Sequence, residues 1–387
     1  MTRPLHTLIG AGLLNAGLGT FYAWSVFVAP FESLLGASRT AVSSVFSLAT
    51  ACFVVGMLVG PRLYGRIPAP WLAGVTCTMA TAGLLLAAGV AALPALLLGY
   101  GVLFGLANGI GYGMALQLVS RAFTRRRGLV TGTVVAAYAA GAAVAAPLLT
   151  RAIDALGLQG SLYLLAGIFL ALVGITAAFL RSGATDLVAR APREKGQSVT
   201  AGLRAVAGDR LFRQMWLAYV LGAGAGLMMI GHAAGLVAAS GATARQLAWG
   251  PVVVSLGNGL GRLAAGWLGD LMPIARVLTG AGAASGLALL GVYFLPATAT
   301  ALVALCVVGT GYGLLAAGYP VAVAHYYGPE QVGAVYGKLF TAWGVGGVLG
   351  PWIAGEVYDL TGAYGPGLFL AGVAALFAAV LTHRLSP

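Results

Sequence analysis

The most informative feature of this sequence is how little charge it carries. Only 8% of its 387 residues are charged, whereas a soluble globular protein carries about 25%. Acidic residues are the scarcest, with nine Asp and Glu against 21 Lys and Arg. Hydrophobic residues make up 60% of the chain, and the mean hydropathy is +0.94. This composition excludes a water-soluble globular protein and indicates a chain that crosses a membrane several times.

Three further absences narrow the class. The three cysteines, Cys52, Cys77 and Cys306, lie within apolar runs, which argues against a disulfide framework or a metal site. The sequence lacks the G-x-x-x-x-G-K-[ST] phosphate-binding motif, so ATP is not expected to drive it. No apolar run pairs a nucleophile with a base or clusters metal ligands, which disfavours an enzyme. We therefore expect neither a cofactor nor a metal.

Twelve apolar runs are each long enough to cross a bilayer, which takes about 20 residues. They lie at about 7–30, 41–60, 71–92, 94–119, 129–150, 161–180, 214–238, 246–269, 276–295, 298–322, 335–354 and 364–382. The first run lacks an A-x-A-like cleavage site, so we expect it to be retained. The pattern predicts an all-α polytopic membrane protein with two six-helix bundles, at 1–180 and 214–387. A polar cytoplasmic linker, 181–213, joins them.

The basic residues predict the orientation. With both termini in the cytoplasm, 17 of the 21 Lys and Arg fall in inner segments and three in outer ones. This asymmetry follows the rule that inner loops are positive. The net charge of +12 therefore reflects membrane topology, and nucleic acid is not expected as a partner. We expect a multi-pass protein of the inner (plasma) membrane.

The two halves of the chain echo each other. The stretch GIGYG at 109–113 recurs as GTGYG at 309–313, which places Tyr112 and Tyr312 at matching positions six spans apart. Both halves also start on the same side of the membrane, as expected of parallel repeats around a central cavity. Glycines four residues apart recur in several spans and allow helix backbones to approach closely.

One arginine, Arg262, stands inside an apolar run that extends from about residue 247 to 268. A charge at the centre of a membrane helix costs about 2.5–3.5 kcal/mol on insertion scales, so a use is expected for it. Ser255 and Asn258 share its helix face, seven and four residues earlier. We expect this polar face to point into the protein, where a guanidinium matches a carboxylate with two hydrogen bonds. The alternative is an arginine that extends toward the cytoplasmic surface.

Four stretches carry motifs of a known family: GTFYAWSVF (19–27), RGLVTG (127–132), GRLAAGWLGD (261–270) and YGKLFTAWG (336–344). Together with the twelve spans, they resemble the major facilitator superfamily, and more narrowly its monocarboxylate transporters and oxalate/formate exchangers. The resemblance implies alternating-access transport of a small carboxylate, with Arg262 binding the carboxylate group. The cavity positions implied by it are Phe21, Tyr22, Tyr112, Tyr138, Asn258, Tyr312 and Phe340. Packing is the alternative role for the aromatic residues.

The chain departs from these relatives at three informative positions. Oxalate exchangers carry a lysine in span 11, and the matching place here is Trp343. Animal monocarboxylate transporters carry an acid one turn before the arginine, where this chain has Asn258. Their span 1 lysine is also missing, with Val26 near that place. A single intramembrane cation favours a substrate with one carboxylate, because a second buried anion would have no partner.

These observations predict a proton-coupled symporter of small monocarboxylates such as lactate or pyruvate. The nearest alternative is an exchanger of the oxalate/formate type, and a multidrug exporter or a non-transporting sensor is more distant. No Asp or Glu lies within a span, so the common carboxylate proton carrier is missing. His232, within span 7, is a proton-coupling candidate because an unperturbed histidine titrates near pH 6.5. We favour the other route, in which the proton travels with the substrate or through water near Arg262.

Overall fold

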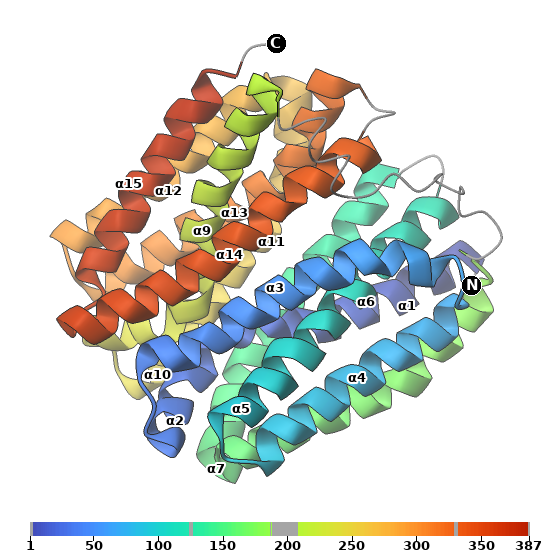
Figure 1. The fold of residues 1–387 in the computed structure, drawn as a ribbon, viewed down its shortest axis with the longest axis horizontal. Helices are drawn as coiled ribbons and strands as arrows, with labels where there is room; N and C mark the ends of the chain where they lie inside the picture. Colours follow the sequence, from blue (N-terminus) through green and yellow to red (C-terminus); the bar gives the residue numbers. More distant parts are fainter. Residues whose placement is uncertain (1–2, 124–126, 186, 188–207, 329–331, 386–387) are drawn as a thin grey trace. The chain divides into compact units, whose positions relative to one another are not determined.

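The computed structural model describes residues 3–123, 127–185, 187, 208–328 and 332–385. These residues form helices and short connections and contain no strand. The chain divides into two compact units, Met1–Ala191 and Pro192–Pro387. Figure 1 shows the helices in chain order, from blue to red. Most of the predicted linker at 181–213 lies outside the described residues.

The first unit contains six helical spans. Its elements are α1 (Arg3–Leu18), η1 (Gly19–Ala23), α2 (Ser25–Leu35), α3 (Arg39–Tyr64), α4 (Ala69–Gly89), α5 (Leu93–Leu96), η2 (Leu97–Phe104), α6 (Gly105–Ala122) and α7 (Arg127–Gly183). The first span is broken, because α2 bends by 51° from the helix formed by α1 and η1. The long α7 holds two helices that meet at Gly157, whose φ of 74° lies in the left-handed region that glycine tolerates.

The second unit contains the other six spans. Its elements are α9 (Arg210–Ala239), α10 (Ala244–Leu247), α11 (Trp249–Leu271), α12 (Ile274–Phe294), α13 (Thr298–Tyr327), α14 (Val332–Thr361) and α15 (Gly365–His383). Eight helices among the described residues are long and apolar enough to cross a membrane, and the bent first pair makes a ninth. The division of α7 into two, together with α11 and α14, brings the number to twelve. The predicted all-α, twelve-helix architecture is confirmed.

Glycines let the helices of each unit make backbone contact. On α13, a Cβ atom added at Gly313 would lie 2.2 Å from the carbonyl oxygen of Asn258 on α11. In the first unit, one added at Gly109 on α6 would lie 2.0 Å from the carbonyl oxygen of Phe53 on α3. Only a residue without a side chain fits at such distances. This packing sets the helix of Arg262 directly against the helix of Tyr312.

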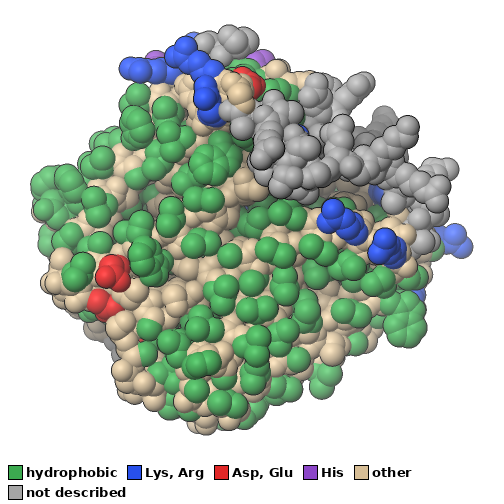
Figure 2. Space-filling model, in the orientation of Figure 1, with side chains coloured by type: hydrophobic (Ala, Val, Ile, Leu, Met, Phe, Trp, Pro, Cys, Tyr) green, Lys and Arg blue, Asp and Glu red, His purple; other side chains and the backbone are tan. Residues whose placement is uncertain are grey.

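Apolar side chains cover much of the visible surface in Figure 2, and the Lys and Arg side chains seen there lie toward the upper edge of the view. Large exposed hydrophobic residues occur on most of the long helices, for example Trp71, Leu170 and Phe294 at more than 60% exposure. A water-soluble protein rarely exposes contiguous apolar surface on this scale. The surface therefore suits contact with lipid.

Candidate functional site

Helix α11 separates a polar face from an apolar one, as its sequence predicts. Ser255, Asn258 and Arg262 are buried, with Asn258 at 0% and Arg262 at 8% exposure. Exposed residues make up the opposite face, and these are Leu256, Leu260, Leu263 and Trp267. The polar side chains thus lie inside the protein, and the leucines and tryptophan lie where lipid would be.

The guanidinium of Arg262 is oriented by its neighbour one turn back along the helix. Its Nε donates a hydrogen bond to Oδ1 of Asn258, 2.8 Å away. Its Cζ also lies 6.0 Å from the ring centroid of Tyr312, within the range of a cation–π contact. Because Asn258 precedes Arg262 in the helix, this hydrogen bond directs the side chain away from the C-terminal end of α11. The geometry argues against an arginine that merely reaches for the membrane surface.

Tyr312 and Phe340, both predicted from the sequence, are connected by Trp343, which was not among the predicted site residues. Trp343 on α14 donates from Nε1 to the hydroxyl of Tyr312, 2.6 Å away. The ring of Phe340, also on α14, stacks on Trp343 with 4.9 Å between centroids and 14° between planes. Tyr312 and Phe340 are therefore joined through Trp343. The sequence did contain one signal for Trp343, because it occupies the place in span 11 where related exchangers carry a lysine.

A second residue that sequence reasoning missed is Tyr219 on α9. It is 0% exposed, and its hydroxyl lies close enough to Arg262, Tyr312 and Tyr336 to interact with them electrostatically. Its ring stacks on Tyr319 of α13, with 4.1 Å between centroids. Helix α9 packs against α11, α13 and α14. The sequence held no signal for Tyr219, because nothing local indicates which helix face turns toward Arg262.

The predicted aromatic residues of the first unit form their own cluster. Tyr138 lies at its centre, with Tyr22 5.1 Å and Tyr112 5.4 Å away between ring centroids, both edge-on. The Tyr138 hydroxyl donates to Oδ1 of Asn108, 2.9 Å away. Phe21 contacts Tyr22 from the same 3-10 segment, at 5.8 Å. Sequence reasoning did not single out Asn108.

The broken first span positions this cluster. A Cβ atom at Gly19 would lie 1.8 Å from the carbonyl oxygen of Tyr138, so η1 and α7 touch at their backbones. The 3-10 segment that begins at Gly19 then turns the next residues inward, and Phe21 is 0% and Tyr22 3% exposed. Arg262, Asn258, Tyr312 and Phe340 belong to the second unit, and Phe21, Tyr22, Tyr112 and Tyr138 belong to the first.

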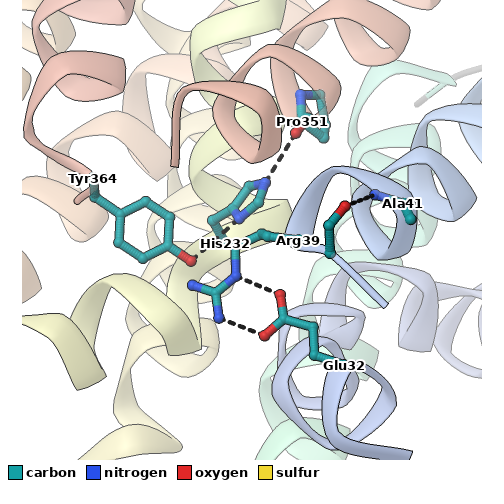
Figure 3. Close-up of polar contacts among 7 residues, drawn as sticks. Glu32, Arg39, Ala41, His232, Pro351 and Tyr364 are labelled. Atoms are coloured by element: carbon teal, nitrogen blue, oxygen red, sulfur yellow. Dashed lines mark hydrogen bonds and ion pairs between the residues drawn. The ribbon is translucent and has the colours of Figure 1, made fainter. Parts of the chain in front are cut away.

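His232 is held between two helices at a place apart from Arg262. Its Nε2 lies 3.0 Å from the carbonyl oxygen of Pro351 on α14, and its Nδ1 lies 3.3 Å from the Tyr364 hydroxyl (Figure 3). A carbonyl only accepts, so Nε2 carries the hydrogen and Nδ1 accepts from Tyr364. Along α9, His232 is 13 residues beyond Tyr219, which is about 20 Å at 1.5 Å per residue. The partners shown for it thus lie on α14 and at the start of α15, not on α11.

Twelve membrane helices in two units, with a buried arginine on a polar helix face, define a membrane transporter rather than an enzyme. The sequence matches the family described as Major Facilitator Superfamily over residues 9–239 and 221–387, and the chain belongs to this family. The predicted family is confirmed, and these proteins are transporters.

The chain is similar to several named proteins along most of its length. It is 29% identical over 382 residues to monocarboxylate transporter 13 of Bos taurus, covering 92% of this chain and 82% of that protein. It is 26% identical over 272 residues to the oxalate:formate antiporter of Oxalobacter formigenes, covering 66% and 61% respectively. A crystal structure of the nucleoside transporter NupG superposes with a TM-score of 0.74 at 16% identity, with 98% of each chain covered. The last similarity concerns the fold alone.

Proposed function

We propose that this protein is a secondary active transporter of small monocarboxylates such as lactate or pyruvate. It moves the acid together with a proton, and its central cavity opens to one side of the membrane at a time. The substrate-binding residues are those predicted from the sequence: Arg262, Asn258, Tyr112, Tyr312, Tyr138, Phe21, Tyr22 and Phe340. The similarity to a named monocarboxylate transporter supports the substrate class.

The observation that carries this proposal is the buried, oriented guanidinium of Arg262. Its position within a membrane helix carries a substantial insertion cost, which a functional charge explains. Asn258 engages Nε at 2.8 Å and so sets the plane of the guanidinium. A planar guanidinium held in this way binds a carboxylate with two parallel hydrogen bonds, which a lysine ammonium cannot do. A small carboxylate is therefore the ligand that the site suits best.

Aromatic side chains supply the remaining parts of such a site. A small organic acid needs a charge partner, one or two hydrogen-bond donors and an apolar wall. In the second unit the Tyr312 ring lies near Arg262, and Phe340 is joined to Tyr312 through Trp343. In the first unit the cluster around Tyr138 offers a further apolar surface. Matching tyrosines in the two repeats support a role for Tyr112 on the first unit's side.

Proton coupling proceeds, in this proposal, with the substrate or through water near Arg262. His232 is a poor carrier in this arrangement, since both of its ring nitrogens have partners, on α14 and at the start of α15. Its imidazole is therefore already engaged within the protein. The substrate itself brings a group that accepts a proton at each crossing.

The proposed location is the plasma membrane, with both termini and residues 181–213 in the cytoplasm. The positive-inside asymmetry of the sequence supports it. A cysteine introduced at Ala191, in a background without the three native cysteines, should resist a membrane-impermeant thiol reagent added to intact cells. Labelling from outside would reverse the topology.

Transport by the purified protein in lipid vesicles tests the function. Uptake of labelled lactate should rise with an inward proton gradient and should be abolished in Arg262→Ala. Arg262→Lys should restore little of it, because the ammonium lacks the planar fork. An unchanged KM in Arg262→Ala would reject the assignment of the carboxylate site.

Exchange of one carboxylate for another is the alternative, supported by the similarity to a named oxalate:formate antiporter. The same vesicles separate the two mechanisms. A symporter fills empty vesicles when the outside is acidic. An exchanger requires vesicles preloaded with a carboxylate and does not respond to the proton gradient.

A further inference from the structure

We propose that Tyr219 determines specificity within the carboxylate site by donating a hydrogen bond to a second oxygen of the substrate. That oxygen is the hydroxyl or carbonyl oxygen next to the carboxylate that Arg262 holds. This inference rests on the proposed function, because it takes Arg262 as the carboxylate partner. It concerns a residue that neither the sequence motifs nor the family resemblance singled out.

The position of Tyr219 is the first ground for the proposal. It projects from α9, whose neighbours include α11, α13 and α14, the three helices that carry Arg262, Tyr312 and Trp343. Its hydroxyl interacts electrostatically with the guanidinium of Arg262 and with the hydroxyls of Tyr312 and Tyr336. The hydroxyl therefore lies close enough to the guanidinium for the two groups to interact by charge.

The hydrogen-bonding state of Tyr219 is the second ground. Its side chain is completely buried, yet its hydroxyl has no hydrogen bond of normal geometry within the described part of the chain. The Tyr336 hydroxyl makes a hydrogen-bonding contribution to Tyr219, outside the geometry of a normal hydrogen bond. The side chain of Asn258 accepts a hydrogen bond from Arg262 at Oδ1. Its buried Nδ2 likewise has no partner among the described residues. Buried polar groups of this kind call for an explanation, since nearly all others are satisfied.

The hydrogen-bonding properties of the Tyr219 hydroxyl and of Asn258 Nδ2 indicate which ligand would satisfy them. A tyrosine hydroxyl and an amide nitrogen both donate, and both lie beside a cation. A ligand that meets all three carries one carboxylate and at least one more acceptor oxygen close to it. A 2-hydroxy or 2-oxo acid has that pattern, whereas a plain fatty acid of equal length does not.

Stacking makes the Tyr219 hydroxyl a fixed donor. Its ring lies on Tyr319, with 4.1 Å between centroids and 27° between planes. A donor held in place loses little conformational entropy when the ligand arrives, so more of the hydrogen bond appears as affinity. Sites that hydrogen-bond a substrate oxygen also discriminate strongly against analogues that lack it.

The chain itself provides a matched control. Tyr319 is buried to the same degree and has a hydroxyl without a partner among the described residues. Unlike Tyr219, Tyr319 has no electrostatic interaction with Arg262 among the described residues. Tyr219→Phe and Tyr319→Phe both remove one buried hydroxyl and keep the stacked rings. Only the first is expected to affect substrate choice.

Transport in lipid vesicles tests the proposal with two acids of the same length. The KM for labelled lactate and the inhibition constant of propanoate, which lacks the 2-hydroxyl, are measured for each variant. Tyr219→Phe should raise the lactate KM about tenfold, which is about 1.4 kcal/mol, and should change propanoate inhibition less than twofold. Tyr219→Met, which also lacks the hydroxyl, should show the same discrimination. Tyr319→Phe should alter neither constant.

Three results would overturn the proposal: an unchanged lactate KM in Tyr219→Phe, an equal change for both acids, or the same change in Tyr319→Phe. Arg262→Ala is measured in parallel to separate the two proposals. Its full activity would reject the proposed function, whereas its inactivity together with a normal Tyr219→Phe would reject only the role of Tyr219. Thermal unfolding of each purified variant verifies that it is folded.

Discussion

The indole Nε1 of Trp343 donates a hydrogen bond to the Tyr312 hydroxyl, 2.6 Å away, and the ring centroid of Tyr312 lies 6.0 Å from Cζ of Arg262. In oxalate exchangers, which this chain resembles, a lysine occupies the place of Trp343. Here the position supplies a neutral donor that is engaged with a tyrosine. The relationship ties Tyr312 to α14. Under the proposed function, a neutral residue at this position favours a substrate with one carboxylate over one with two.

Replacing Trp343 with lysine should therefore change the preferred substrate. A second cation near Arg262 offers a partner to a second carboxylate, which otherwise has to be buried unpaired. We expect oxalate to compete with labelled lactate at least about tenfold better in Trp343→Lys than in the wild type, a difference of about 1.4 kcal/mol. Trp343→Phe is the control and should weaken both acids without changing their order. Equal competition in the two variants would contradict this prediction.

Asn258 orients Arg262, so its removal should weaken binding without abolishing it. Asn258→Ala leaves the guanidinium without its 2.8 Å acceptor and should raise the lactate KM about five- to tenfold, consistent with about 1 kcal/mol for one hydrogen bond. Ser255→Ala, one turn earlier on the same face, should change KM less than twofold. Loss of transport in Ser255→Ala would show that the whole face is needed.

His232 should prove structural. In His232→Gln, uptake should still rise as the external pH falls, because the proton route does not include the imidazole. The variant should melt a few degrees lower, since its contacts to Pro351 and Tyr364 connect α9 to α14 and to the start of α15. Tyr364→Phe should lower the melting temperature in the same direction. A pH response that disappears in His232→Gln alone would make the histidine the proton carrier.

Replacing two glycines on α11 with alanine should affect the stability of the protein differently. A Cβ atom at Gly261 would lie 2.1 Å from the carbonyl oxygen of Thr310, so the helices must separate, at a cost of about 1–3 kcal/mol or more. At Gly266 a Cβ atom meets no described atom within 4 Å. Gly261→Ala should lower the melting temperature of the purified protein, whereas Gly266→Ala should leave it unchanged. Equal melting temperatures would show that α11 and α13 adjust to the added methyl group.

The sequence by itself determined the number of spans, the repeat and the position of the central charge. These follow from properties read along one chain: a bilayer requires about 20 apolar residues, and an arginine within them is expensive. The periodicity of α11 also predicted which of its faces is polar, and Ser255, Asn258 and Arg262 are buried accordingly. The resemblance to the family pointed to Tyr312 and Phe340, which the structure places around Trp343.

Only the tertiary structure decided which side chains from other helices surround Arg262. Tyr219 and Trp343 come from α9 and α14, and neither helix carries a local signal of the rotation that brings Tyr219 near Arg262 and Trp343 to Tyr312. The same holds for His232, whose partners lie on α14 and at the start of α15. Hydropathy along the sequence indicates which segments cross the membrane. The rotation of one helix against another depends instead on which side chains and glycines meet across their contact, and those residues lie far apart in the sequence.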